Sequence, residues 1–155
     1  TVTSERRAIR EWGGDNQDTI LPNDPNPDPN SGVYNTDVLL SRGSGVHPAA
    51  EFCRSLGSEY FLANREEIVP LFNNKTIIDS SDPTVDSSTT TPSLINIANG
   101  TALDNGLTAN RSSAVLTSTE SSAELCRFID MSNGLVYGFG KNITMWVVPI
   151  RRIPA

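Results

Sequence analysis

Hydrophobic residues between positions 46 and 57 recur at the spacing of a short helix. The segment reads VHPAAEFCRSLG, and its apolar positions, three or four residues apart, are Ala49, Phe52, Cys53 and Leu56. Such positions share one face of a helix, while Pro48 suits the first turn and Gly57 the C-terminal end. The pattern therefore predicts one short amphipathic helix.

The next segment, YFLANREEIVPLF at 60–72, has a similar organisation. Asn64 and Glu67 have the spacing of a capping box, in which each side chain bonds the backbone N–H of the other residue. The apolar stripe that we expect to be buried consists of Ile68, Leu71 and Phe72. We therefore predict a second short helix here.

The last part of the chain has the character of β-strands. Residues 114–150 contain ELCRFIDM, LVYGFG and ITMWVVPI, separated by SNG and KN. The Asn133-Gly134 pair favours a tight hairpin turn, and Pro149 lacks an N–H, so it must lie at a sheet edge or beyond the ladder. The pattern predicts an antiparallel β meander and, with the two helices, an α+β domain.

Two further segments complete the expected domain. Residues 36–41, TDVLLS, are expected to form a short strand. Residues 73–113 are polar, with low complexity in DSSDPTVDSSTTTPS, and predict a long irregular loop. Loops of this length are usually functional or mobile.

The N-terminal part predicts an attachment segment, 1–32, ahead of one domain, 33–155. Residues 4–12 could be a short helix or an extended arm, and the prolines of 22–30 require a stiff, solvated connector. Alternating Asp and Asn residues in this connector resemble a calcium loop. The required Gly is missing and Asn35 stands where Glu is needed, so we predict no metal.

Composition excludes several classes of function. The 155-residue chain has 18 Asp and Glu against 12 Lys and Arg, a net charge of −6. An acidic surface opposes nucleic-acid binding, which needs cationic side chains to displace counterions. No apolar run approaches the roughly 18 residues of a membrane span. We therefore expect no nucleic-acid partner and no insertion into a membrane.

The residues that most often carry nucleophilic or metal chemistry are few. Cys53, Cys126 and His47 are the only cysteines and histidine. Six residues separate His47 from Cys53, which places them on different sides of a helix, and too few ligands remain for zinc. The cysteines predict two buried free thiols, with a single disulfide as the alternative. We predict no catalytic residue and no cofactor, and a structural role for His47.

A hydroxyl-rich stretch, LTSTES at 116–121, precedes the strand ELCRFIDM. Hydroxyls beside a carboxylate can serve catalysis, ligand binding or a turn. Ser and Thr near a turn readily bond backbone groups. We therefore predict a structural corner, in which Ser118 and Thr119 hold the passage from loop to strand and Glu120 bonds a backbone group or an arginine.

Three stretches together resemble one family. YFLANREEI at 60–68 is similar to its Trp-Arg-Leu-Pro-Thr-x-x-Glu-Leu motif, AVLTSTES at 114–121 to Tyr-Trp-Ser-Ser-Thr-Glu, and WVVPIR at 146–151 to Tyr-Val-Arg-Pro-Val-Arg. Over residues 33–153 the chain thus resembles the C-type lectin-like domain that ends collagen-like adhesins of the Lcl type, also found in phage receptor-binding proteins. The resemblance implies a C-type lectin-like fold with two short helices, a twisted antiparallel β meander and long irregular loops.

The resemblance also implies a non-enzymatic binding module. With the stiff connector it favours a virion protein, such as a phage fibre, knob or capsid-decoration protein, that engages the host cell surface; an extracellular or cell-surface location is the alternative. Segment 1–32 would contact other virion proteins within a homo-oligomer or larger assembly. Exposed loops would contact a host glycan or protein through Asn105, Asn110, Arg111, Tyr137 and Asn142.

Two other interpretations stay open from the sequence. The same fold could be a purely structural virion protein that packs on or cements neighbouring subunits. An enzyme related to the formylglycine-generating fold would need a reactive cysteine pair, which a cysteine on the apolar face of a helix and one inside a strand do not suit.

Overall fold

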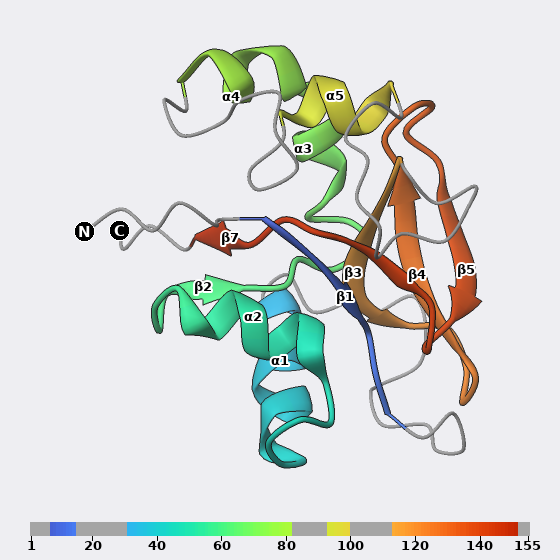
Figure 1. The fold of residues 1–155 in the computed structure, drawn as a ribbon. Coiled ribbons are helices and arrows are strands. Elements are labelled where there is room, and N and C mark those ends of the chain that lie inside the picture. The colour runs from blue at the N-terminus through green and yellow to red at the C-terminus, as the bar shows by residue number, and fades with distance from the viewer. Residues whose placement is uncertain (1–6, 15–30, 82–92, 100–112, 152–155) are drawn as a thin grey trace.

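The computed structural model describes residues 7–14, 31–81, 93–99 and 113–151. A five-stranded sheet lies between two groups of helices (Figure 1). In spatial order, its strands are β1 (Ala8–Glu11), β6 (Thr144–Val147), β3 (Ala114–Glu120), β4 (Leu125–Asp130) and β5 (Val136–Gly140). A smaller sheet consists of β2 (Tyr60–Phe61) and β7 (Ile150–Arg151). The helices in these ranges are α1 (Ser31–Ser41), α2 (Pro48–Ser55), α3 (Val69–Asn73), α4 (Lys75–Ser81) and α5 (Leu94–Ala98). The fold is therefore α+β, as the sequence predicts.

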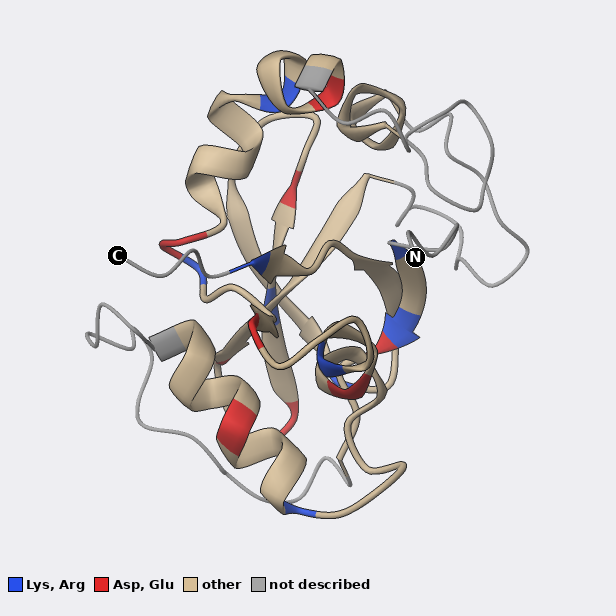
Figure 2. Cartoon of the chain, turned by 90° about the vertical axis from the view of Figure 1, so that its left-hand side faces the viewer, with Lys and Arg blue, Asp and Glu red and all other residues tan. Residues whose placement is uncertain are grey.

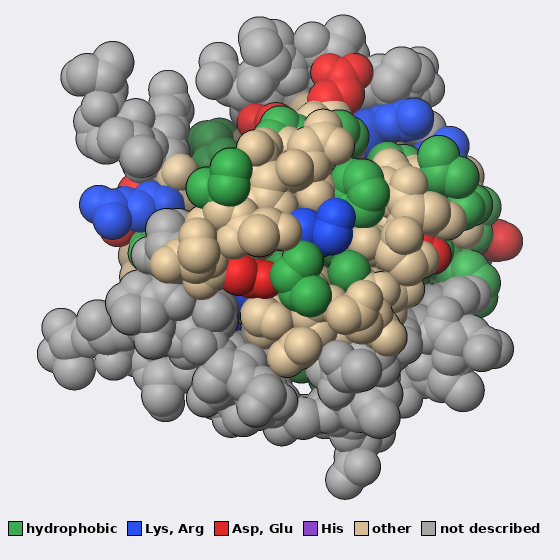
Figure 3. Space-filling view, turned by 90° about the horizontal axis from the view of Figure 1, so that it is seen from above, with side chains coloured by type: hydrophobic (Ala, Val, Ile, Leu, Met, Phe, Trp, Pro, Cys, Tyr) green, Lys and Arg blue, Asp and Glu red, His purple; other side chains and the backbone are tan. Residues whose placement is uncertain are grey.

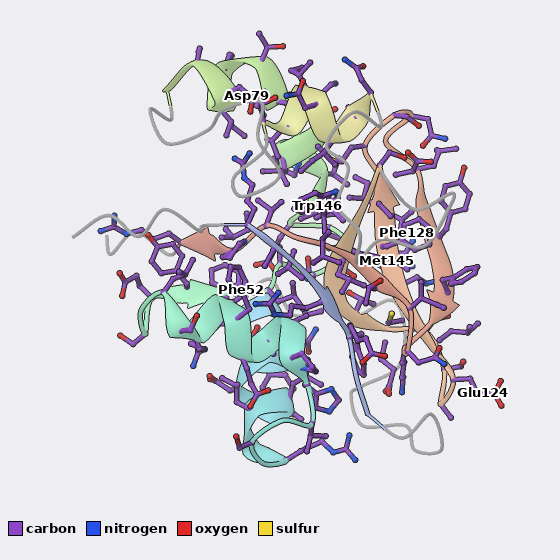
Figure 4. All side chains as sticks on the ribbon, viewed as in Figure 1. Phe52, Asp79, Glu124, Phe128, Met145 and Trp146 are labelled. Carbon is purple, nitrogen blue, oxygen red and sulfur yellow. The ribbon has the colours of Figure 1, made fainter. Side chains whose placement is uncertain are left out.

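Each face of the main sheet carries its own hydrophobic cluster, because successive side chains of a strand point to opposite sides. On one face Leu116 and Met145 pack with Trp12 and with the apolar face of α2. On the other face Val115 and Trp146 pack with α3 and α5. Met145 and Trp146, both labelled in Figure 4, are neighbours on β6 and belong to different clusters.

Helix α2 confirms the first predicted helix. Pro48 begins it, the helix stops ahead of Gly57, and its buried side chains are Ala49, Ala50, Phe52 and Cys53. The capping box of the second segment also forms. The Asn64 Oδ1 accepts the Glu67 N–H at 2.6 Å, and Glu67 Oε1 accepts the Asn64 N–H at 2.9 Å. The box closes a turn, and α3 itself begins only at Val69.

Residues 36–41 form part of helix α1, so the strand predicted there is wrong. The buried positions of α1 have helical spacing but include two polar residues; they are Gly32, Asn35, Thr36 and Leu39. Thr36 Oγ1 donates to the Gly32 carbonyl at 2.7 Å and accepts the Leu62 N–H at 3.0 Å. Because much of the buried face is polar, the apolar periodicity that reveals most helices is missing.

The loop predicted at 73–113 contains helices α4 and α5 in its described parts, which corrects that expectation. The two helices pack on each other. The carboxylate of Asp79, labelled in Figure 4, accepts the N–H groups of Leu94 and Ile95 at 2.8 and 3.0 Å. It thereby satisfies donors that the first turn of a helix leaves unpaired.

On the side of the molecule seen from above, hydrophobic side chains are scattered among polar ones (Figure 3).

The predicted meander holds for β4 and β5, which are antiparallel neighbours, and β3 pairs antiparallel with the other side of β4. It is wrong for β6, which crosses to the other side of β3. There it pairs in parallel with β3 through Val115 and Trp146 and antiparallel with β1. The sheet is therefore mixed. Pro149 lies between β6 and β7, beyond the main ladder, as predicted.

The N-terminal strand corrects part of the expected attachment segment, 1–32. Of the two forms predicted for residues 4–12, the structure has the extended one at 8–11, and this strand forms one edge of the main sheet. Trp12, directly after it, is fully buried. Residues 8–12 therefore help to build the domain instead of projecting from it. The proline-rich connector lies outside the described residues.

Candidate ligand-binding site

Strand β3 carries the hydroxyl-rich stretch, and the structure places it in the interior. The side chains at 117–120 belong to residues that are at most 3 % exposed. The register with β4 shifts between Leu116 and Glu120, so this part of β3 is free to bond another segment. The Ser118 N–H donates to the Ala63 carbonyl at 2.7 Å. The stretch is therefore an irregular, buried part of a strand and not a corner ahead of one.

The hydroxyl groups of this stretch bond elements that are distant in sequence. Thr119 Oγ1 accepts the Arg65 backbone N–H at 2.9 Å. Ser118 Oγ accepts a bond from Asn35 Nδ2 at 3.2 Å, which joins β3 to α1. These bonds hold the segment after β2 and helix α1 against the sheet. They support the structural role predicted for Ser118 and Thr119.

Glu120 bonds a lysine, where an arginine or a backbone group was expected. Lys141 Nζ lies 2.6 Å from Glu120 Oε2, and both side chains are 1 % exposed. The ammonium also lies 4.9 Å from the centre of the Trp12 ring, within the range of a cation–π contact. The Lys141 carbonyl accepts the Gly13 N–H at 2.9 Å. The pair therefore ties the N-terminal strand and the β5–β6 turn to β3.

His47 is also part of the interior. Its Nδ1 lies 2.9 Å from the Trp12 carbonyl, which can only accept, and its Nε2 lies 2.8 Å from the Arg42 guanidinium, which can only donate. This arrangement requires the neutral ring with the proton on Nδ1. Burial lowers the pKa of His47 below its ordinary value, and the nearby cations Arg42 and Lys141 lower it further. The structural role predicted for His47 agrees with these contacts.

Both cysteines are buried free thiols, as the first of the two predictions stated. Burial raises the pKa of Cys126 to about 12 and raises that of Cys53 as well. A thiol is nucleophilic as its thiolate, which such a pKa makes scarce at neutral pH. Neither cysteine has the electrostatic surroundings of a catalytic or redox-active thiol.

A pocket of about 280 Å³ opens where β3, β4 and β5 lie side by side. Three aromatic side chains form its apolar part: Phe128, Tyr137 and Phe139. They share one face of the sheet, since Phe128 pairs with Tyr137 and Cys126 with Phe139 in the ladder. The rings of Phe128 and Tyr137 have centres 5.7 Å apart and are tilted by 33°. Tyr137 is 40 % exposed, so one side of the aromatic group faces solvent.

Polar groups stand beside these rings. Asp130 and Ser113 line the same pocket. The Asp130 Oδ1 accepts bonds from the Ser113 hydroxyl at 2.9 Å, and from the backbone N–H and hydroxyl of Ser132 at 2.9 and 2.6 Å. These bonds fix the carboxylate at the start of the β4–β5 turn. The site therefore combines a rigid aromatic surface with a positioned carboxylate and hydroxyl.

Of the five contact residues predicted from the sequence, Tyr137 lines this pocket. Asn142 is exposed in the turn after β5, at the opposite end of that strand, so the structure does not bring the two together. The other three, Asn105, Asn110 and Arg111, lie outside the described residues.

Sequence reasoning missed Phe128, Phe139, Ser113 and Asp130. The alternation in ELCRFIDM and LVYGFG carried a usable signal, because Phe128 and Asp130 are two residues apart and so are Tyr137 and Phe139. Residues at that spacing share a face of a strand. The register of the hairpin, which puts Phe128 and Asp130 beside Tyr137 and Phe139, needed the structure.

In Figure 2 the acidic and basic residues of the described part of the chain are interspersed over helices and strands. They do not gather into a patch of one charge. Among the described residues, no three His, Cys, Asp or Glu side chains come together in a way that could hold a metal ion. No helix in the described ranges is long and apolar enough to cross a membrane. No family model, no curated protein and no solved structure matches the chain.

Proposed function

We propose that this chain is a non-enzymatic binding module with a C-type lectin-like fold, exposed on a virion as a phage fibre, knob or capsid-decoration protein. In this proposal it engages a glycan of the host cell surface through the aromatic pocket. The observation that carries the proposal is the pocket itself, in which Phe128, Tyr137 and Phe139 meet a positioned carboxylate. A pocket with apolar walls and few convergent polar groups is the usual form of a ligand site.

The chemistry of the pocket suits a single sugar ring. One face of a pyranose presents C–H groups, which pack against the electron-rich face of an aromatic ring. Its hydroxyls need directional partners, and the Asp130 carboxylate and the Ser113 hydroxyl stand beside the rings. The volume of about 280 Å³ lies just below the range of roughly 300–1,000 Å³ that holds drug-sized ligands. One ring or a terminal residue of a longer glycan would fit such a space.

The interior residues support a role without catalysis. The only histidine bonds Trp12 and Arg42 through its two ring nitrogens. The only cysteines are buried, and the pKa of each thiol is raised. The side chains that most often serve as nucleophile and base are therefore committed to the core.

Contacts among the three family-like stretches support the C-type lectin-like fold. The Ala63 carbonyl and the Arg65 N–H of the first stretch bond Ser118 and Thr119 of the second. Strand β2 in the first stretch pairs with β7 in the third. Residues that resemble one family in three separate places therefore meet at one location, as expected if they are the framework of one fold.

The proposal is tested by screening the protein against a panel of host-surface glycans and measuring affinity for the best one. Replacement of Tyr137 by Ala should weaken binding at least tenfold, since exposed aromatic anchors often contribute 2 kcal/mol or more. Leu135→Ala is the matched control, because Leu135 is 56 % exposed on the same hairpin but does not line the pocket. It should change affinity less than twofold. Equal losses for both variants would contradict the pocket assignment, and binding to a host protein alone would contradict the glycan.

One observation favours the purely structural virion protein instead. Strand β5 is the last strand of the main sheet, and it carries the exposed Tyr137 and adjoins the exposed Leu135. An edge strand can pair with a neighbouring subunit. If Leu135→Asp abolished incorporation into particles while Tyr137→Ala left host adsorption intact, the structural function would be the correct one.

A further inference from the structure

A second pocket, of about 240 Å³, lies between β7 and helices α3 and α4. Two of its lining residues are arginines, Arg7 and Arg151, and none is acidic. This composition is unusual for a chain in which 18 acidic residues outnumber 12 basic ones. In the sequence each of these arginines adjoins a second one, Arg6 and Arg152, which lie outside the described residues.

The two arginines reach the pocket from opposite ends of the chain. Arg7 directly precedes β1 and is 5 % exposed, whereas Arg151 ends β7 and is exposed. Strands β1 and β7 belong to different sheets, and the pocket lies where these two sheets approach helices α3 and α4. The fold thus brings a buried and an exposed arginine to one cavity.

The remaining walls are apolar. Leu71 of α3 and Ile78 of α4 stand on one side, and residues 148–150, Val-Pro-Ile, on the other. Apolar walls favour burial of hydrocarbon groups and disfavour strongly hydrated ions such as phosphate. A guanidinium binds a carboxylate through two parallel N–H bonds and loses less hydration than an ammonium would.

We propose that this pocket binds a monocarboxylate that carries a short apolar group, with the exposed Arg151 binding the carboxylate and Leu71, Ile78 and residues 148–150 contacting the apolar part. The ligand is an aliphatic or aromatic acid, either free or as the C-terminal residue of a peptide. The site shares no lining residue with the aromatic pocket, so it does not depend on the proposed glycan function.

A titration of the full chain with acetate, butanoate and hexanoate, followed by calorimetry, tests the proposal. Affinity should increase about fourfold for each added methylene, because each becomes buried against apolar walls. Hexanamide, which lacks the charge, should bind at least tenfold more weakly than hexanoate. Equal affinities for hexanoate and hexanamide, or tighter binding of inorganic phosphate, would overturn the assignment.

Variants locate the site. Arg151→Gln should weaken hexanoate binding at least tenfold, and because Arg151 is exposed the protein should still fold. Arg65→Gln, which removes an arginine outside the pocket, should change the affinity less than twofold, as should Tyr137→Ala. Unchanged hexanoate affinity in Arg151→Gln would overturn the proposal. This holds whether or not Arg7→Gln, a change at a more buried residue, folds.

The two sources of the carboxylate are separated by a peptide pair. Acetyl-Gly-Gly-Leu with a free C-terminus should bind more tightly than hexanoate if a peptide end is the ligand, and less tightly if a free acid is. Its C-terminal amide should bind at least tenfold more weakly than the acid form. Equal binding of the acid and amide peptides together with equal binding of hexanoate and hexanamide would refute both sources.

Discussion

The hydroxyl-rich part of β3 and the aromatic pocket contain the same kinds of polar side chain in opposite situations. In β3, the residues Ser118, Thr119 and Glu120 are at most 3 % exposed and bond other parts of the chain. In the pocket, Asp130 and Ser113 stand beside a ring that is 40 % exposed. Of the two clusters, only the one beside the exposed ring has surface that a ligand could reach.

The energetics of burial explain the difference. A polar group taken out of water must find a partner inside the protein, or the fold is destabilised. In β3 those partners come from α1, from the segment after β2 and from Lys141. The polar side chains of β3 therefore form their bonds within the protein. In the pocket, the Tyr137 ring is partly exposed to water, so a ligand that covered it would gain from the hydrophobic effect.

The largest effect is expected from Lys141→Met. Removing one member of a buried ion pair leaves the Glu120 carboxylate buried without its cation, which costs roughly 3–5 kcal/mol in comparable pairs. Chemical denaturation measures the loss in the free energy of unfolding. The double variant Lys141→Met with Glu120→Leu should be less destabilised than Lys141→Met alone, since it also removes the buried carboxylate. Lys75→Met, a control on the partly exposed helix α4, should cost at most about 1 kcal/mol.

A smaller effect is expected when the hydroxyls are removed one at a time. Ser118→Ala and Thr119→Ala should each lower the free energy of unfolding by about 1 kcal/mol, the usual contribution of one hydrogen bond. Ser41→Ala, at an exposed residue of α1, is the control and should change stability by less than about 0.5 kcal/mol. If the β3 variants were as stable as the wild type, these hydroxyls would not be structural.

The smallest effect concerns pH. The pKa of His47 is lower in the fold than its ordinary value of 6.5, so the unfolded chain binds a proton first as the pH falls. The contribution of His47 to stability is therefore complete above pH 6.5 and is lost progressively as the pH falls from 6.5 to the folded pKa. Chemical denaturation of the wild type and of His47→Gln between pH 5 and 8 measures this contribution. It is the difference between the two proteins in how steeply the free energy of unfolding changes with pH. Equal slopes would show that protonation does not disturb the bonds to Trp12 and Arg42.

The sequence predicted the elements whose buried faces are apolar. Helix α2 and the strands β4 and β5 have that character, and the capping box at Asn64 and Glu67 depends on spacing alone. Helix α1 was missed because Asn35 and Thr36 occupy its buried face. Helix α5 has a capping serine, Ser93, and buries Leu94 and Ile97, but its five residues are too few to show a helical period. Polar contacts between distant residues leave no periodic signal.

The candidate site was predicted only through Tyr137. That residue was expected to contact a ligand because of its place beside the β4–β5 turn. Phe128 and Phe139 stand in a hydrophobic alternation that is equally typical of core packing. The sequence therefore could not show whether these rings pack in the core or line a pocket. The position of β6 beside β3 depends on long-range pairing and has no local signal at all.

The polar stretch of β3 supports the fold, whereas the aromatic pocket is the proposed binding site. The most direct test is to measure glycan affinity for Tyr137→Ala and Ser118→Ala in one titration series, each at a temperature where the variant is folded. We predict at least a tenfold loss for Tyr137→Ala and less than a twofold change for Ser118→Ala. The opposite result, in which folded Ser118→Ala loses binding and Tyr137→Ala keeps it, would place the ligand at β3 and contradict the account.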